Sequence, residues 1–178
     1  MNPTKETSSL SYLNATGHIP YGMTNDYMFR LILEKNNYVL KGLICSLLSL
    51  TPEKIISVEI QNPILLNETV KDKEFILDIK VLMNDSAIIN LEMQMAYMLN
   101  WRERSLSYLC RAFDQLSHGQ LYDNVKPAIH IGFLNFNPTP DDKPEFYASY
   151  KLLNEKTHAA HSDKFILRVV NLKQIDSA

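Results

Sequence analysis

The chain has 178 residues, of which 46% are hydrophobic and 21% are charged, which predicts one globular domain with a substantial core. Its formal net charge of −2 excludes a general basic field that would attract nucleic acid or an anionic membrane surface. Any contact with nucleic acid should therefore be local or helped by bound metal ions. No apolar run approaches the roughly 20 residues of a membrane-spanning helix. Cys45 and Cys110 lie in apolar, helix-like runs and are expected to be buried free thiols, as suits a reducing cytoplasm.

The first third of the chain predicts a tail, two helices and a strand. Residues 1–20 are rich in Ser, Thr and Asn and are expected to form a flexible tail. Polar capping residues then precede a stretch with apolar residues at helical spacing, and the polar run EKNN interrupts it. Two helices are therefore expected, at about 25–34 and 36–49. A turn and a strand near 55–60 should follow.

Two β-rich runs separated by the turn signature Asn-Asp-Ser predict a β-hairpin over 75–95. If Met83 pairs with Ala87, alternate residues of the two strands form one wholly apolar face and one mixed face. On the mixed face, Asp78 then lies directly opposite Glu92.

The rest of the chain predicts one long helix and three strands. The segment 101–122 is strongly helical, with Gly119 as a stop signal. The apolar run 127–136 predicts a buried strand, and 146–155 and 164–172 predict two peripheral strands. The order of elements indicates a single α/β or α+β domain.

The mixed face of the hairpin needs a neutralising group, because two carboxylates directly opposite each other repel. A proton shared between Asp78 and Glu92, a cation such as Lys80, or a metal ion would serve. Hard divalent cations prefer carboxylate oxygens, and Mg²⁺ is often held by one or two of them together with substrate phosphate. The face is therefore a candidate metal-dependent phosphodiester site.

The alternative is that this face is the solvated side of an edge hairpin, where charges are ordinary. Two features argue against that alternative. Apolar residues on the same face, Ile76, Leu82 and Ile88, favour partial cover. The following helix begins with Trp101 and also carries Arg104, so its first turn is able to approach the acids.

The motifs LDIKV and NLEMQ, with Asp on one strand and Glu-x-Gln on the next, resemble the PD-(D/E)XK nuclease superfamily. More narrowly, the chain resembles its transposase-like branch of recombination-promoting nucleases. The resemblance covers about residues 22–137 and extends weakly to about 172, including TNDYMFRLIL, RERSLSYLCRAFDQLSHGQLY and KPAIHIGFLNF. It implies a restriction-endonuclease-like αβββαβ core with a small mixed sheet flanked by helices. It also implies a nuclease-like core at 21–137 and a peripheral extension at 138–178. The extension is expected to be part of a truncated C-terminal region.

Residue by residue, the resemblance implies that Asp78 is the metal-binding acid of the second core strand and Glu92 the acid of the third. Gln94 stands where the superfamily usually has Lys, and its amide can orient water or phosphate only by hydrogen bonds. We interpret Lys80 as the missing cation, with simple ion pairing to Asp78 as the alternative. The backbone carbonyl of Met93 is a further candidate metal ligand.

Three more residues match the family pattern and have a structural alternative. Asp26, at the start of the first helix, is a candidate metal ligand or simply favourable to the helix dipole. Arg104 and Tyr108, four residues apart on one helix, are candidates for binding substrate phosphate, for bracing the acids, or for a purely structural role.

His130, in an apolar strand, is interpreted as a core histidine with satisfied hydrogen bonds.

The resulting hypothesis is a divalent-metal-dependent DNA endonuclease associated with recombination or transposition. It would use Mg²⁺ or Mn²⁺, act on DNA in the cytoplasm, and form a homodimer. The alternative is a catalytically degenerate member that binds nucleic acid or protein through the same scaffold. A third interpretation is a structural domain with a solvated acidic face.

Overall fold

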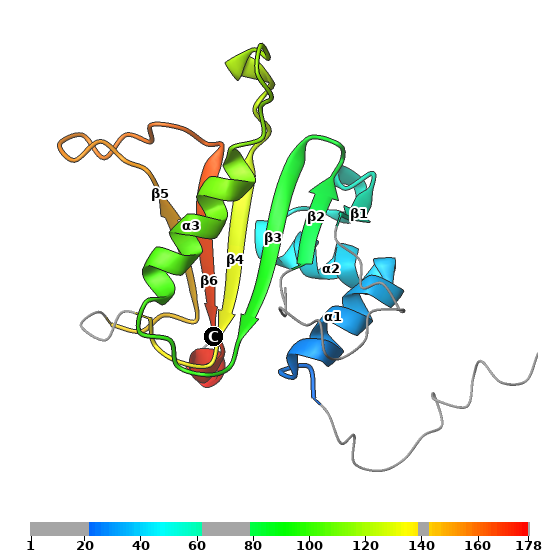
Figure 1. Cartoon of the computed structure of the whole chain (residues 1–178). Coiled ribbons are helices and arrows are strands. Elements are labelled where there is room, and N and C mark those ends of the chain that lie inside the picture. Colours follow the sequence, from blue (N-terminus) through cyan, green and yellow to red (C-terminus); the bar gives the residue numbers. More distant parts are fainter. Residues whose placement is uncertain (1–21, 62–78, 139–142, 178) are drawn as a thin grey trace, which may run out of the picture.

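The computed structural model describes residues 22–61, 79–138 and 143–177, in which a six-stranded mixed sheet lies between two layers of helices (Figure 1). Its elements are α1 (Asp26–Lys35), α2 (Asn37–Leu48), β1 (Val58–Ile60), β2 (Ile79–Met83), β3 (Ala87–Gln94), α3 (Trp101–Phe113), β4 (Ala128–Leu134), β5 (Tyr147–Lys151) and β6 (Phe165–Asn171). The strand order is β1-β2-β3-β4-β6-β5. Strands β3, β4 and β6 are parallel, and the other neighbours are antiparallel. The expected αβββαβ order is confirmed.

The two N-terminal helices are separate because an asparagine begins each of them. The side chain of Asn25 accepts a hydrogen bond from the backbone N–H of Met28. Asn36 has extended backbone between the helices, and its side chain accepts from the backbone N–H groups of Tyr38 and Val39. Each side chain satisfies N–H groups that a helix leaves unpaired at its first turn. The predicted pair of helices is confirmed.

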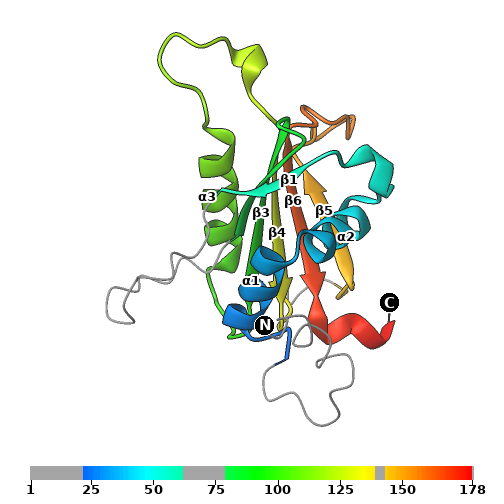
Figure 2. The same ribbon diagram turned by 90° about the vertical axis from the view of Figure 1, so that its right-hand side faces the viewer.

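The two faces of the sheet pack against different helices (Figure 2). Side chains on one face are apolar and form the main core with α1 and α2, including Phe29, Leu33, Ile44, Val81, Leu91 and Phe133. The other face is covered by α3, whose Leu109 and Ala112 contact Ile88 and Ala128. The polar side chains of the hairpin belong to this second face.

The register of the hairpin is the one that the alternation of residues predicts. Met83 pairs with Ala87, and Lys80 pairs with Asn90. Asp78 lies outside the described residues, so its position opposite Glu92 stays a prediction.

The hairpin turn is tied to the segment before β1 by one side chain. Asn84 and Asp85 have positive φ angles of 52° and 50°, which asparagine and aspartate tolerate well. The side-chain oxygen of Asn84 accepts hydrogen bonds from the backbone N–H groups of Ile56 and Ser57, and its amide nitrogen donates to the carbonyl of Lys54. These bonds position β1 beside β2.

Helix α3 is shorter than expected, because it ends at Phe113 and not near residue 122. The side chain of Gln115 donates hydrogen bonds to the carbonyl oxygens of Ala112 and Lys126, and so closes the helix end against the segment that leads into β4. Gly119, with a φ of 86°, belongs to a later turn. The prediction that it stops this helix is wrong.

The last two strands belong to the same sheet as the core. Strand β6 lies between β4 and β5 and buries Val169, Val170 and Asn171. It is therefore an internal strand, which corrects the expectation that both strands are peripheral, whereas β5 is an edge strand. The expected boundary near residue 137 stays a prediction, and the expected tail at 1–20 lies outside the described residues.

The two cysteines differ in their exposure to solvent. Cys45 is half-buried and Cys110 is exposed, so the expectation of two buried thiols is wrong for Cys110. Both are free. Within the described ranges, every helix is too short or too polar to cross a membrane.

The first residue of α3 is seated on a glycine of β4. Trp101 is almost fully buried, and a Cβ atom added to Gly132 would lie 2.4 Å from Cζ2 of its ring. Real atoms do not approach so closely, so a side chain at this position would displace the start of α3. Gly132 therefore allows α3 to dock close to the sheet.

Substitution of Gly132 by alanine is expected to lower the free energy of unfolding by about 1–3 kcal/mol, because the new methyl group overpacks the Trp101 site. Urea denaturation measures the change. Gly42→Ala is the matched control, since this helical glycine has open space around it and should gain about 0.5–1 kcal/mol. Equal effects of the two substitutions would contradict the proposed docking.

Candidate active site

The polar face of β3 is completed by the neighbouring parallel strand. Asn90 pairs with His130, and Glu92 pairs with Gly132. Because alternate residues of a strand point to the same side, Asn90, Glu92 and His130 share the face that α3 covers. Since β3 lies between β2 and β4, the alternative of a solvated edge hairpin is wrong for this strand.

Glu92 carries a buried carboxylate that two cationic or proton-donating groups approach. Only 1% of the residue is exposed. Nε of Arg104 donates a hydrogen bond of 2.8 Å to Oε1, and Nε2 of His130 lies 3.3 Å from Oε2. Burial by itself raises the pKa of Glu92, but the contacts with His130 and Arg104 together lower the pKa to below its ordinary value. The carboxylate is therefore ionised at neutral pH.

One oxygen of this carboxylate is held less firmly than the other. Oε2 of Glu92 and Nε2 of His130 are both buried, and neither has a well-aligned hydrogen bond with a partner in the described ranges. The 3.3 Å contact between them is thus mainly electrostatic. A carboxylate oxygen with an uncommitted lone pair suits a hard divalent cation. Glu92 therefore fits the predicted role of a metal ligand.

His130 is more closely connected to the acid than the sequence indicated. It is fully buried, as expected for a core histidine, but its Nδ1 lies 3.0 Å from Nδ2 of Asn90 and its Nε2 faces Glu92. Its ring stacks on Tyr108, with centroids 5.9 Å apart and an angle of 9° between the planes. The available signal was a polar residue in an otherwise apolar strand, at a position that shares a face with Glu92 once β3 and β4 are paired.

Arg104 contacts Glu92, and Tyr108 stacks on His130. The guanidinium carbon of Arg104 lies 4.8 Å from the centroid of the Tyr108 ring, while its Nε binds Glu92. Of the roles considered for these two residues, this geometry favours bracing of the acid. Their proposed contact with substrate phosphate stays a prediction.

The remaining hairpin candidates are placed less tightly. Lys80 is exposed and lies on the same face of the sheet as Glu92. Gln94 is half-buried on that face, and its amide nitrogen donates to the carbonyl of Ala96 at 3.0 Å. Asp78 lies outside the described residues, so its role stays a prediction.

The other two candidate metal ligands also stay predictions. The side chain of Met93 is buried on the opposite, apolar face, so only its backbone carbonyl is relevant. Asp26 is half-buried in the first turn of α1, and burial raises its pKa. Its Oδ1 is buried without a hydrogen-bond partner in the described ranges. Among the described residues, which do not include Asp78, no three His, Cys, Asp or Glu side chains gather as a metal-binding group.

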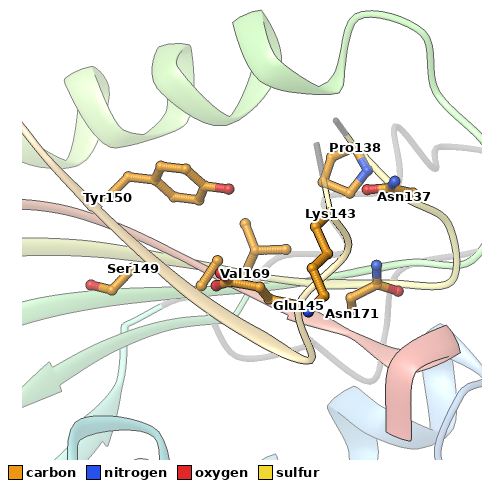
Figure 3. Close-up of a pocket in the computed structure, with 9 residues that line it drawn as sticks. Asn137, Pro138, Lys143, Glu145, Ser149, Tyr150, Val169 and Asn171 are labelled. Carbon is orange, nitrogen blue, oxygen red and sulfur yellow. The ribbon is translucent and has the colours of Figure 1, made fainter. Parts of the chain in front are cut away.

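Two hollows of the described surface lie near the start of α3 and the end of β6. Figure 3 shows a cavity of about 360 Å³ near the carboxyl end of β6, lined by Asn137, Pro138, Lys143, Glu145, Ala148, Ser149, Tyr150, Val169 and Asn171. A second cavity, of about 350 Å³, adjoins it beneath Trp101 and Arg102. None of the predicted acids lines either one. The candidate site is therefore identified by its buried carboxylate and not by cavity size.

Substitution of Glu92 by glutamine should destabilise the protein in a pH-dependent way. The folded pKa of Glu92 is below the ordinary 4.5, so its ionisation contributes stability above that pH and loses the contribution as the pH falls through the folded value. We expect the free energy of unfolding to fall by about 1–3 kcal/mol at neutral pH, and the difference from wild type to shrink in acid.

Denaturation curves at several pH values measure this difference. Asp163→Asn is the control, because Asp163 is exposed in its pair with Lys151 and should show a much smaller loss. A loss for Glu92→Gln that does not change with pH would contradict an ionised, paired carboxylate.

Comparison with known proteins gives one family match. A family model described as PD-(D/E)XK nuclease family transposase matches residues 23–178, a range that includes every helix and strand of the sheet and its flanking layers. Comparisons with curated proteins and with solved structures gave no match. The family match agrees with the resemblance of the hairpin motifs and extends it through β5 and β6.

Proposed function

Because the chain belongs to the PD-(D/E)XK nuclease family transposases, we propose that it hydrolyses phosphodiester bonds of DNA with a divalent metal ion, in recombination or transposition. The observation that carries this proposal is the buried, ionised carboxylate of Glu92 on β3, with Gln94 two residues further along the same face. Burial of a carboxylate is unfavourable by itself, so its presence at this position supports a functional role.

In this proposal Asp78 and Glu92 hold Mg²⁺ or Mn²⁺, with the carbonyl of Met93 and the carboxylate of Asp26 as further ligands. When bound, the metal lowers the pKa of a water molecule and stabilises charge on the phosphate. Arg104 holds Oε1 of Glu92 and thereby leaves Oε2 for the metal.

Gln94 and Lys80 act on the substrate in complementary ways. The amide of Gln94 orients water or phosphate by hydrogen bonds, but it cannot take up a proton. Lys80 is exposed and supplies a positive charge for a phosphate on the same face of the sheet. Since the net charge of the chain is −2, contact with DNA depends on such local cations and on the metal. The expected homodimer and cytoplasmic location stay predictions.

One observation favours the alternative of a non-cleaving binding module. Arg104 forms an ion pair with Glu92 that offsets its charge, and Gln94 takes the place of the usual Lys. A site of this kind would retain the fold while binding nucleic acid or protein.

Nicking of supercoiled plasmid in Mg²⁺ or Mn²⁺ tests the proposal. We expect wild type to nick only with metal, and Asp78→Asn and Glu92→Gln to lose at least about 100-fold in rate, because even outer-shell changes at metal sites often reduce activity that far. Asp163→Asn is the matched control, an exposed acid outside the site that should retain full activity.

Two outcomes would contradict this assignment. A folded wild type that is inert with both metals would favour the binding module. Cleavage that survives both substitutions would show that the acids are wrongly assigned.

A further inference from the structure

His130 is a fully buried imidazole that the proposed hydrolysis does not use directly. Both of its ring nitrogens face polar groups of β3: Nδ1 lies 3.0 Å from Nδ2 of Asn90, and Nε2 lies 3.3 Å from Oε2 of Glu92. A buried imidazole needs a polar partner at each ring nitrogen. Here one of the two partners is the carboxylate of Glu92, so the ring is placed to influence the orientation of that carboxylate.

The contact with Asn90 determines which nitrogen carries the proton. The amide nitrogen of asparagine only donates, so Nδ1 of His130 must accept. In a neutral imidazole the proton then lies on Nε2, so that the positive end of this N–H group lies near Oε2 of Glu92, with the two heavy atoms 3.3 Å apart. The opposite tautomer would place two lone pairs against each other at this contact.

The His130 ring is also held by a residue that stacks on its face. Tyr108 stacks on it almost in parallel, and the guanidinium of Arg104 covers the Tyr108 ring while it binds Oε1 of Glu92. The two groups that hold the carboxylate are therefore linked through Tyr108. Rotation of Glu92 would break contacts on both of its oxygens.

We propose that His130 is a positioning residue for Glu92, which it orients through the Nε2–H tautomer that Asn90 selects. The long contact fixes the plane of the carboxylate but leaves a lone pair of Oε2 available. The value of this orientation for metal binding rests on the proposed function, whereas the tautomer and its effect on Glu92 do not. Histidine as a direct metal ligand would require an unprotonated Nε2 and the reversed amide of Asn90.

Nuclear magnetic resonance of the whole 178-residue chain without metal tests the tautomer. In long-range ¹H–¹⁵N spectra we expect His130 to be protonated on Nε2 and unprotonated on Nδ1. Asn90→Ala should mix the two tautomers and shift the ¹³C resonance of the Glu92 carboxylate. Asn171→Ala is the matched control, a buried amide on β6 whose side chain binds the backbone of Lys173, and it should leave both signals unchanged.

Mn²⁺ titration calorimetry supplies a second readout on two substitutions of His130. His130→Leu should weaken Mn²⁺ binding about 10–100-fold, as loss of an outer-shell group does at other metal sites. His130→Gln keeps an N–H donor and should restore affinity to near the wild-type level. Thermal melts report whether each variant is folded.

The outcomes separate this proposal from the proposed function. Protonation on Nδ1, an unchanged Glu92 resonance in Asn90→Ala, or loss of the Nε2 proton to a direct metal bond would overturn the positioning role. Wild-type affinity in folded His130→Leu would overturn it too. A wild type that binds no Mn²⁺ would instead overturn the metal site, and the metal-free spectra alone would then decide the role of His130.

Discussion

The charge of Glu92, placed in a part of the sheet that a helix covers, determines what must surround it. Taking a carboxylate out of water is unfavourable by roughly several kcal/mol, unless paired groups replace the lost hydration. Arg104 and His130 supply this replacement, and Arg104 does so only while α3 is docked. Docking in turn requires the bare backbone at Gly132, which admits the ring of Trp101. Acid, helix and glycine therefore depend on one another.

The stability of the fold does not by itself explain the buried charge of Glu92. Apolar side chains of similar size often stabilise a core as well as a buried ion pair does, so an ion pair is weak evidence of a stabilising role. The opposite face of the same hairpin is filled with apolar side chains. Strand β3 thus separates two kinds of packing: one face that holds the fold together and one that keeps an ionised group oriented beneath α3.

Local chemistry made much of the fold predictable from the sequence. The alternation of apolar and polar residues along β2 and β3 determines which residues lie on each face of the sheet. A slip of one residue would bury the polar side chains of the hairpin in the main core. Asn36 both ends one helix and begins the next, and the hairpin motifs identified the family. The end of α3 was not predictable in this way, because Gln115 closes it by a contact with Lys126, in the segment that leads into β4.

The candidate site was predictable only where it is local. Glu92 and Gln94 follow from one strand, but Asn90 and His130 meet only because β3 and β4 are parallel neighbours in one register. Parallel pairing joins distant segments through a helical crossover, and no turn signature records its register. The internal place of β6 escaped prediction for the same reason. Diffraction from crystals soaked in Mn²⁺ tests most directly our proposal that Glu92 binds a metal ion. We expect anomalous density beside a carboxylate oxygen of Glu92, with Arg104 retained on the other oxygen. Absence of density at Glu92, while Mn²⁺ binds elsewhere on the chain, would contradict it.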